Sequence, residues 1–148
     1  MTGAVVVGYD GSATAVDALE WAATEAARRR ARLVVLHASD LALLLAPAGR
    51  PGWVGHVPDT LAQQVTNDGA DRARKLAPEL DVEAMTPVEN PSGALAQASR
   101  TAALVVVGNR GHGPVTGPLL GSVAYSVATH AHCPVVVVRG ESEEGLET

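Results

Sequence analysis

The 148-residue chain has no phenylalanine, one cysteine, one lysine (Lys75) and no apolar run long enough to cross a bilayer. Aromatic residues make up 3% of the chain and apolar residues 47%, so the core has to be built from Val, Leu and Ala. A single cysteine excludes a framework of internal disulfides and fits a reducing compartment. The apolar runs fall far short of the roughly 18 residues that a membrane-spanning helix needs, and no signal peptide is visible. We therefore expect a cytoplasmic protein without a membrane segment.

Net charge and chain length indicate a single-domain protein that does not bind nucleic acids. The formal net charge of −5 and the pI near 5.4 give no reason to expect nucleic-acid binding. The arginines at 28–32 are better explained as the solvated end of a helix, where positive side chains are favourable. The length fits one domain. We expect residues 1–139 to form that domain and the acidic residues 140–148 to be a disordered tail.

The order of predicted elements indicates an α/β fold. Short apolar runs are typical of strands buried on both faces of a parallel sheet. Four such runs are Ala4–Val7, Leu33–Leu36, Leu104–Val107 and Val135–Val138, and Asp81–Thr86 is a weaker fifth strand. Helical periodicity predicts helices at Ala13–Arg30, Thr60–Leu76, Ser92–Thr101 and Gly121–Ala131. Strands that alternate with helices predict a single doubly wound, Rossmann-like domain, with five parallel strands and helices on both faces.

Three details of these elements can be checked against a structure. Ser12 and Asp59 are the predicted N-caps of the first two helices, and Pro91-Ser92 marks the start of the third. The connection at 41–57 is unusually long, and long loops in compact domains are often lids or binding loops. Trp53 in this loop could cover a ligand or a partner, or pack on the domain.

A glycine-spaced segment follows the fourth strand. Gly108-Asn109-Arg110-Gly111 is followed by nine residues and then by Gly121-Ser122, which gives the spacing G-x2-G-x9-G-S. Glycine lets backbone N–H groups approach an anion without interference from a Cβ. Gly121-Ser122 opens a helix from Val123, and the positive end of that helix can face the same anion. The segment therefore predicts a phosphate site.

A second loop is expected to meet the first. In open α/β sheets, ligands bind beyond the carboxyl ends of the strands, where the strand order reverses. The loop at 8–12 would lie there, and Asp10 is the only carboxylate in either loop. Asp10 could accept hydrogen bonds from a ribose or a base, help to hold a divalent cation, or only cap a helix. Arg110 is a better phosphate ligand than His112, because a guanidinium stays charged.

Other sites are less well supported. The P-loop pattern GxxxxGK(S/T) and the dinucleotide fingerprint GxGxxG are both absent. The group His130, His132 and Cys133 could suggest a metal site, but a helix end and a small buried thiol explain it better. His37 could point into the site or into the core, and the core is the favoured alternative. No catalytic Ser/His/Asp or Cys/His arrangement is present in the sequence pattern.

Five segments together resemble the universal stress protein family. They are VVVGYDGS at 5–12, LVVLHA at 33–38, VVVGNRG at 105–111, LLGSVA at 119–124 and HCPVVVVR at 132–139. The resemblance covers residues 2–139 and implies the strand order 3-2-1-4-5. In this family the glycine motif implies ATP binding, with Mg²⁺ plausible beside the phosphates.

By position, the resemblance also implies the ligand-binding residues. Gly8 and Asp10 would lie on the adenosine side, the backbone of Ala38 would meet the adenine edge, and the glycine segment would hold the phosphates. The full set is Gly8, Asp10, Ala38, Val107, Gly108, Asn109, Arg110, Gly111, Gly113, Gly121, Ser122 and Val123. Pro114 and Pro118 depart from the usual pattern, which puts the shape of the phosphate loop in question.

The last strand favours assembly. Val135–Val138 is apolar throughout, and an apolar strand at a sheet edge invites pairing with another chain. The resemblance implies a homodimer through antiparallel pairing of this strand. We therefore predict a dimeric, ATP-binding stress-response module whose nucleotide state alters its contact with an unidentified protein partner. Slow ATP hydrolysis or phosphoryl transfer is one alternative, although the lysine clamp is missing and Asp10 is the only candidate base. A nucleotide-free dimeric scaffold is the other.

Overall fold

Five parallel strands form one sheet in the computed structural model, which describes residues 3–39, 57–110 and 120–140. The strands are β1 (Val5–Gly8), β2 (Leu33–Leu36), β3 (Val82–Met85), β4 (Leu104–Gly108) and β5 (Val135–Val138). Their order is β3-β2-β1-β4-β5, and every neighbouring pair is parallel. The predicted α/β class and strand order are both confirmed.

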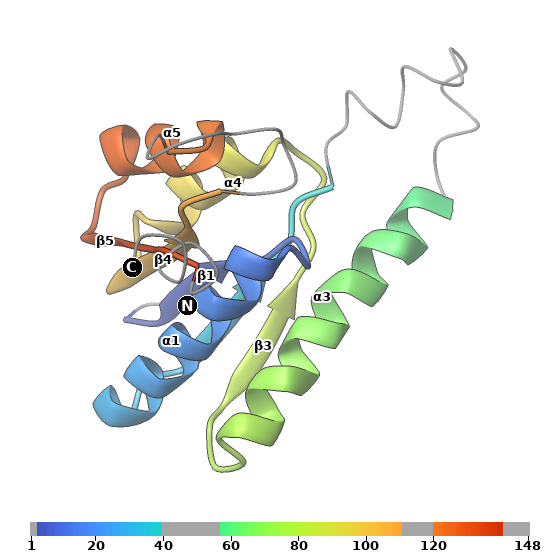
Figure 1. Ribbon diagram of the computed structural model, residues 1–148, viewed down its shortest axis with the longest axis vertical. Helices are drawn as coiled ribbons and strands as arrows, with labels where there is room; N and C mark the ends of the chain where they lie inside the picture. Colours follow the sequence, from blue (N-terminus) through green and yellow to red (C-terminus); the bar gives the residue numbers. More distant parts are fainter. Residues whose placement is uncertain (1–2, 40–56, 111–119, 141–148) are drawn as a thin grey trace, which may run out of the picture.

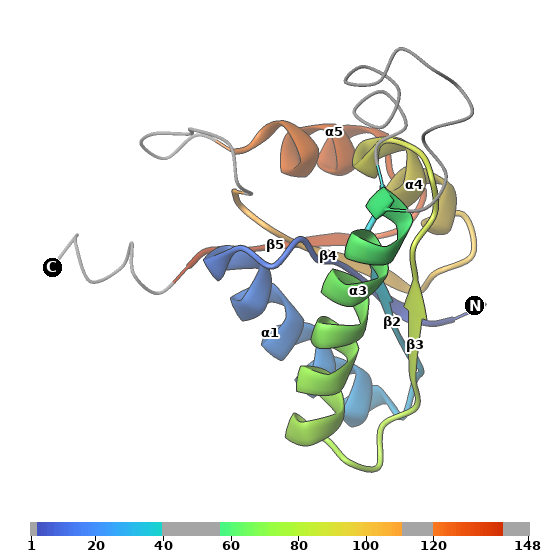
Figure 2. The ribbon, with the colours of Figure 1, turned by 90° about the vertical axis from the view of Figure 1, so that its right-hand side faces the viewer.

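The helices cover the two faces of the sheet in pairs (Figures 1 and 2). On one face lie α1 (Ala13–Arg29) and α3 (Val57–Leu76), and on the other lie α4 (Pro91–Ala98) and α5 (Ser122–His130). Because successive strand residues point to opposite faces, Val5 and Val7 pack under α1 while Val6 packs toward α4. None of the helices in these described ranges is both long and apolar enough to cross a membrane.

Small side chains build the core, as the absence of phenylalanine predicts. Val5, Val6 and Val7 are fully buried, and so are Val105 and Val106 in the neighbouring strand β4. The face of α1 that meets the sheet is almost entirely alanine. Its buried residues are Ala15, Ala18, Leu19, Ala22, Ala23 and Ala26. An alanine face lets the helix axis approach the valine surface closely, which compensates for the small volume of each side chain.

Several predicted helix starts are wrong by one to three residues because the capping residues differ. Asp59 does not cap α3, since that helix already begins at Val57. Helix α4 begins at Pro91, and Asn90 caps it by accepting a 2.7 Å hydrogen bond from the Gly93 N–H. The same helix ends at Ala98 instead of the predicted Thr101. The predicted cap Ser12 is correct, since its Oγ accepts from the Ala15 N–H at 3.3 Å.

Parts of two predicted segments lie outside the described residues. Of the loop at 41–57, only Val57 is described, as the first residue of α3, and Trp53 is not. The tail at 140–148 is described only at Gly140. The predicted roles of the loop, and the division of the chain into a domain and a tail, stay predictions.

Tyr9 packs against a glycine of α3. Its side chain follows β1 directly and is 4% exposed, and its ring lies against the backbone at Gly69. A Cβ built at Gly69 would come within 2.8 Å of a ring carbon of Tyr9. Burial raises the pKa of the Tyr9 hydroxyl, while a hydrogen bond with Arg72 acts in the opposite direction. A glycine in the middle of α3 is therefore required by the approach of an aromatic ring.

We expect Gly69→Ala to lower the free energy of unfolding by about 1 kcal/mol. Overpacking against the Tyr9 ring costs about 1–3 kcal/mol. Alanine is about 1 kcal/mol more favourable than glycine in a helix, which offsets part of this cost. Urea denaturation of both proteins measures the difference. Asn67→Ala is the control, because Asn67 is an exposed residue of the same helix. A Gly69→Ala protein more stable than wild type would show that the ring contact imposes no constraint.

Candidate functional site

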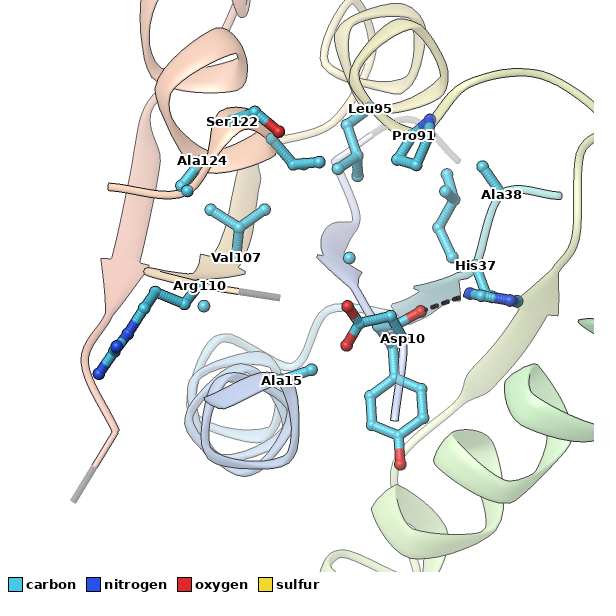
Figure 3. Close-up of a pocket in the computed structure, with 16 residues that line it drawn as sticks. Asp10, Ala15, His37, Ala38, Pro91, Leu95, Val107, Arg110, Ser122 and Ala124 are labelled. Carbon is cyan, nitrogen blue, oxygen red and sulfur yellow. Dashed lines mark hydrogen bonds between the residues drawn. The ribbon is translucent and has the colours of Figure 1, made fainter. Parts of the chain in front are cut away.

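A cavity of about 220 Å³ lies beyond the carboxyl ends of β1, β2 and β4 (Figure 3). The chain enters it from β1 at Gly8–Asp10, from β2 at Leu36–Ala38 and from β4 at Val107–Gly108. The first turns of α4 and α5 complete the wall. Connections from β1 and β4 leave to opposite faces of the sheet, through α1 and α5, so the strand order reverses here. The cavity therefore lies where the sequence predicts a ligand site.

One end of the cavity is apolar. Leu36 and Ala38 line it from β2, and Pro91 and Leu95 line it from α4. The N-terminus of α4 has little to offer an anion, because the Asn90 side chain already accepts the Gly93 N–H and Pro91 has no N–H at all. This end fits the flat, apolar face of a ring better than it fits a charged group.

The other end is formed by the N-terminus of α5. Gly121 is the N-cap, and within the described part of the chain no side chain caps the helix. The Gly121 N–H donates to the Asn109 carbonyl at 2.7 Å. The next N–H groups, at Ser122 and Val123, belong to the first turn, which has no acceptors within its own helix. Both residues line the cavity, so this end can receive an anion.

Two glycines make room for this arrangement. A Cβ at Gly8 would lie 3.0 Å from Leu95 Cδ1 and 3.4 Å from Val107 Cγ1, and so would narrow the cavity between α4 and β4. A Cβ at Gly108 would lie 2.8 Å from Thr14 Oγ1 and 2.9 Å from the Thr14 carbonyl oxygen. Thr14 Oγ1 also donates to the Arg110 carbonyl, which holds the chain beyond β4 against the start of α1. Glycine at 108 is therefore a packing requirement, while a larger residue at 8 would force the Leu95 side chain to shift.

Asp10 stabilises the turn between β1 and α1 and also lines the cavity. Its Oδ1 accepts a 2.9 Å hydrogen bond from the Ser12 N–H, which stabilises the turn from β1 into α1. Gly11 in that turn has φ +82°, a conformation that glycine adopts without strain. Figure 3 shows the Asp10 carboxylate between His37 and Ala15, on the cavity side of the turn. Both predicted roles, the structural and the ligand-facing one, are compatible with this position.

The structure brings most of the predicted site residues to one cavity. Those that line it are Gly8, Asp10, Ala38, Val107, Gly108, Arg110, Gly121, Ser122 and Val123. Gly111 and Gly113 lie outside the described residues.

Asn109 is not among the lining residues. It is 3% exposed, and its backbone N–H donates to the Val138 carbonyl at 2.9 Å while its carbonyl accepts from Gly121. It thus joins β5 to the cap of α5.

Arg110 lines the cavity, but its side chain extends away from the apolar end. In Figure 3 the Arg110 guanidinium points away from Leu95 and helix α4. The predicted phosphate contact of Arg110 would therefore need another side-chain rotamer.

The sequence pattern did not identify the α4 wall or assign His37 to the cavity. Pro91 and Leu95 are four residues apart on one helix, so an apolar pair at this spacing beside a proline is the signal that could have identified them. The core was the favoured place for His37, and that interpretation is wrong: His37 lines the cavity, and its Nδ1 lies 2.9 Å from the Tyr9 carbonyl oxygen.

His130 and Cys133 have other contacts at the end of α5 and before β5. His130 Nδ1 lies 2.9 Å from the Ser126 carbonyl oxygen, at the end of α5. Cys133 is half-buried, and burial raises the pKa of its thiol. Among the described residues, no group of three or more His, Cys, Asp or Glu side chains could hold a metal ion.

Solved structures with the same fold are found among universal stress proteins. One, solved in complex with cAMP, is 30% identical and superposes with a TM-score of 0.69 over 95% of this chain and 98% of its own. Another, from Archaeoglobus fulgidus in complex with dAMP, is 24% identical with a TM-score of 0.71 over 92% of this chain and 97% of its own. At that identity the second likeness speaks for the fold alone.

Sequence comparisons agree. A universal stress protein of Mycobacterium tuberculosis is 37% identical over 136 residues, which are 91% of this chain and 44% of the relative. One from Mycobacterium bovis is 35% identical over 139 residues, 91% of this chain and 45% of the relative. The chain thus spans less than half the length of these curated relatives. The sequence pattern of the universal stress protein family itself matches residues 1–139. The chain belongs to the universal stress protein family.

Proposed function

We propose that this domain binds ATP in the cavity beyond β1, β2 and β4. The observation that carries the proposal is the polarity of the cavity, which has an apolar end beside α4 and a helix N-terminus without a side-chain cap at α5. A nucleoside phosphate has the same polarity, since its base is flat and largely apolar and its phosphates are anionic. The relative of 30% identity that was solved with cAMP supports an adenine nucleotide.

In this orientation each end of the nucleotide has a partner. The base lies against Leu36, Pro91 and Leu95, and the backbone of Ala38 meets its edge. The Asp10 carboxylate accepts hydrogen bonds from the ribose hydroxyls. The N–H groups of Ser122 and Val123, with the Ser122 hydroxyl, bind the phosphates. Mg²⁺ would enter with the phosphates, since it is usually bound through phosphate oxygens and few protein ligands.

We expect Ser122→Glu to abolish ATP binding and leave the fold intact. A carboxylate in the first turn of α5 favours the helix dipole but repels phosphate at the same place. The affinity for MgATP, measured by calorimetry, should fall at least about tenfold. Nucleotide released from the purified protein by heat and quantified by anion exchange should fall in parallel.

Ala128→Glu is the matched control for Ser122→Glu. It adds the same charge to an exposed residue of α5 that does not line the cavity, and it should bind ATP as wild type does. Equal ATP affinity in all three proteins would refute the proposed phosphate site. A wild-type protein that releases no nucleotide and binds no MgATP would favour the nucleotide-free scaffold instead.

We further propose that the domain forms a homodimer through β5. This strand lies at the edge of the sheet, and its four valines are only half-buried. The carbonyl oxygens of Pro134 and Val138 accept hydrogen bonds from β4. Because alternate residues face alternate sides, the N–H and C=O groups of Val135 and Val137 point to the open edge. An antiparallel strand from a second copy would satisfy these groups. We infer that the bound nucleotide would control contact with a protein partner at this same edge.

We expect Val137→Pro to convert the dimer to a monomer. Proline removes the outward N–H of Val137 but no hydrogen bond to β4, and proline is tolerated at such edge positions. Light scattering should give twice the 15.1 kDa chain mass for wild type and the chain mass for the variant. Val137→Ala keeps the N–H and should stay dimeric. A monomeric wild type, or a dimeric Val137→Pro, would contradict the proposed interface.

A further inference from the structure

The side chain of His37 reaches from β2 to β1 at the mouth of the cavity. Its Nδ1 lies 2.9 Å from the carbonyl oxygen of Tyr9, as the dashed line in Figure 3 marks. A carbonyl oxygen can only accept, so Nδ1 carries the proton of this hydrogen bond. His37 itself lines the cavity and is half-buried. The contact joins a side chain of one central strand to the backbone of the other at the point where both strands end.

This contact replaces a backbone hydrogen bond of the sheet. The Tyr9 N–H donates to the Leu36 carbonyl at 2.9 Å, which is the last bond of the β1–β2 ladder. In a parallel ladder the next bond would run from the Ala38 N–H to the Tyr9 carbonyl. Instead, the Tyr9 carbonyl accepts its hydrogen bond from the Nδ1 of His37. Across the residues that the structure describes, the Ala38 N–H has no backbone acceptor.

The free peptide groups of Ala38 point toward the cavity side of β2. The N–H groups of His37 and Ser39 donate to the carbonyls of Met85 and Pro87, at 3.0 and 2.8 Å, on the β3 side. Since the direction alternates along a strand, the N–H and C=O of Ala38 face the opposite, β1 side. Ala38 is 8% exposed and lines the cavity next to its apolar end.

We propose that His37 is a positioning residue that determines the base selectivity of the site. By ending the β1–β2 ladder one bond early, it leaves a donor and an acceptor of one residue, Ala38, available to the edge of a bound base. This inference rests on the proposed function. A neighbouring N–H and C=O match a 6-aminopurine, which offers an acceptor at N1 and a donor at N6. A 6-oxopurine offers the reverse order, a donor at N1 and an acceptor at O6.

The other residues at this end cannot make the same distinction. Leu36, Pro91 and Leu95 present apolar surface, which contacts the face of either purine equally. Sites that discriminate strongly do so by hydrogen bonds that the wrong ligand leaves unmade. The preference for a 6-amino group therefore depends on the Ala38 peptide groups, and through them on His37.

The test compares three ligands and three proteins by calorimetry. MgATP and inosine triphosphate differ at position 6 and in the protonation of N1, and inorganic tripolyphosphate has no base at all. Wild type should bind MgATP at least about tenfold more tightly than inosine triphosphate. In His37→Leu the Tyr9 carbonyl is free to accept the Ala38 N–H, so this preference should fall nearly to unity. Tripolyphosphate affinity should stay the same, because it depends on α5.

His37→Asn is the conservative variant. Its amide nitrogen can donate from a position near that of Nδ1, so it should keep most of the preference for MgATP. Two results would overturn the role of His37 while leaving the ATP site intact: an unchanged preference in His37→Leu, or an equal loss of affinity for all three ligands, which indicates a purely structural role. A wild-type protein that binds no MgATP would overturn the proposed function and this inference together.

Discussion

Burial of β1 and β4 on both faces is the constraint from which the other elements take their positions. Five valines of these strands have no exposed surface, so each face of the sheet needs a covering layer. Connections between parallel strands have to cross over, and the helices that make the crossings supply both layers. Because β1 and β4 are neighbours whose connections leave to opposite faces, none of the described helices and strands lies directly over their carboxyl ends. The cavity is thus a consequence of how the sheet is covered, before any ligand is considered.

Within the cavity, the two helix N-termini are chemically different although both point inward. Helix α4 has its cap from Asn90 and a proline at its first position, so one of its first N–H groups is missing and that of Gly93 is already bonded. Helix α5 begins with glycine and serine, which leave its first turn open. The two helices are of similar length but differ in capping, so the cavity has one apolar end and one end that can receive an anion.

Four of the strands could be predicted because a continuous apolar run has few alternatives to a buried strand, whereas the strand order followed from the family resemblance. That the start of α5 lines the cavity could be predicted because glycine spacing and a helix start are visible in the chain. Helix ends were less predictable, since several residues near 59 and 91 are competent caps and only the backbone geometry selects Asn90. The position of His37 could not be predicted, because the sequence does not show that β1 turns away at Tyr9 and leaves its carbonyl open to a side chain.

The alanine face of α1 has a consequence for the entropy of folding. Alanine loses no rotamer freedom on burial, and valine has little to lose. A core of longer side chains would bury more surface for each residue, but each of those side chains would have to be fixed in one conformation. Here α1 and the sheet are in tight contact mainly because their backbones are fixed close together, since the side chains between them are small. Order in this core therefore depends mainly on the main chain, and among the described residues of this core Tyr9 is the only aromatic ring that has to be held in place.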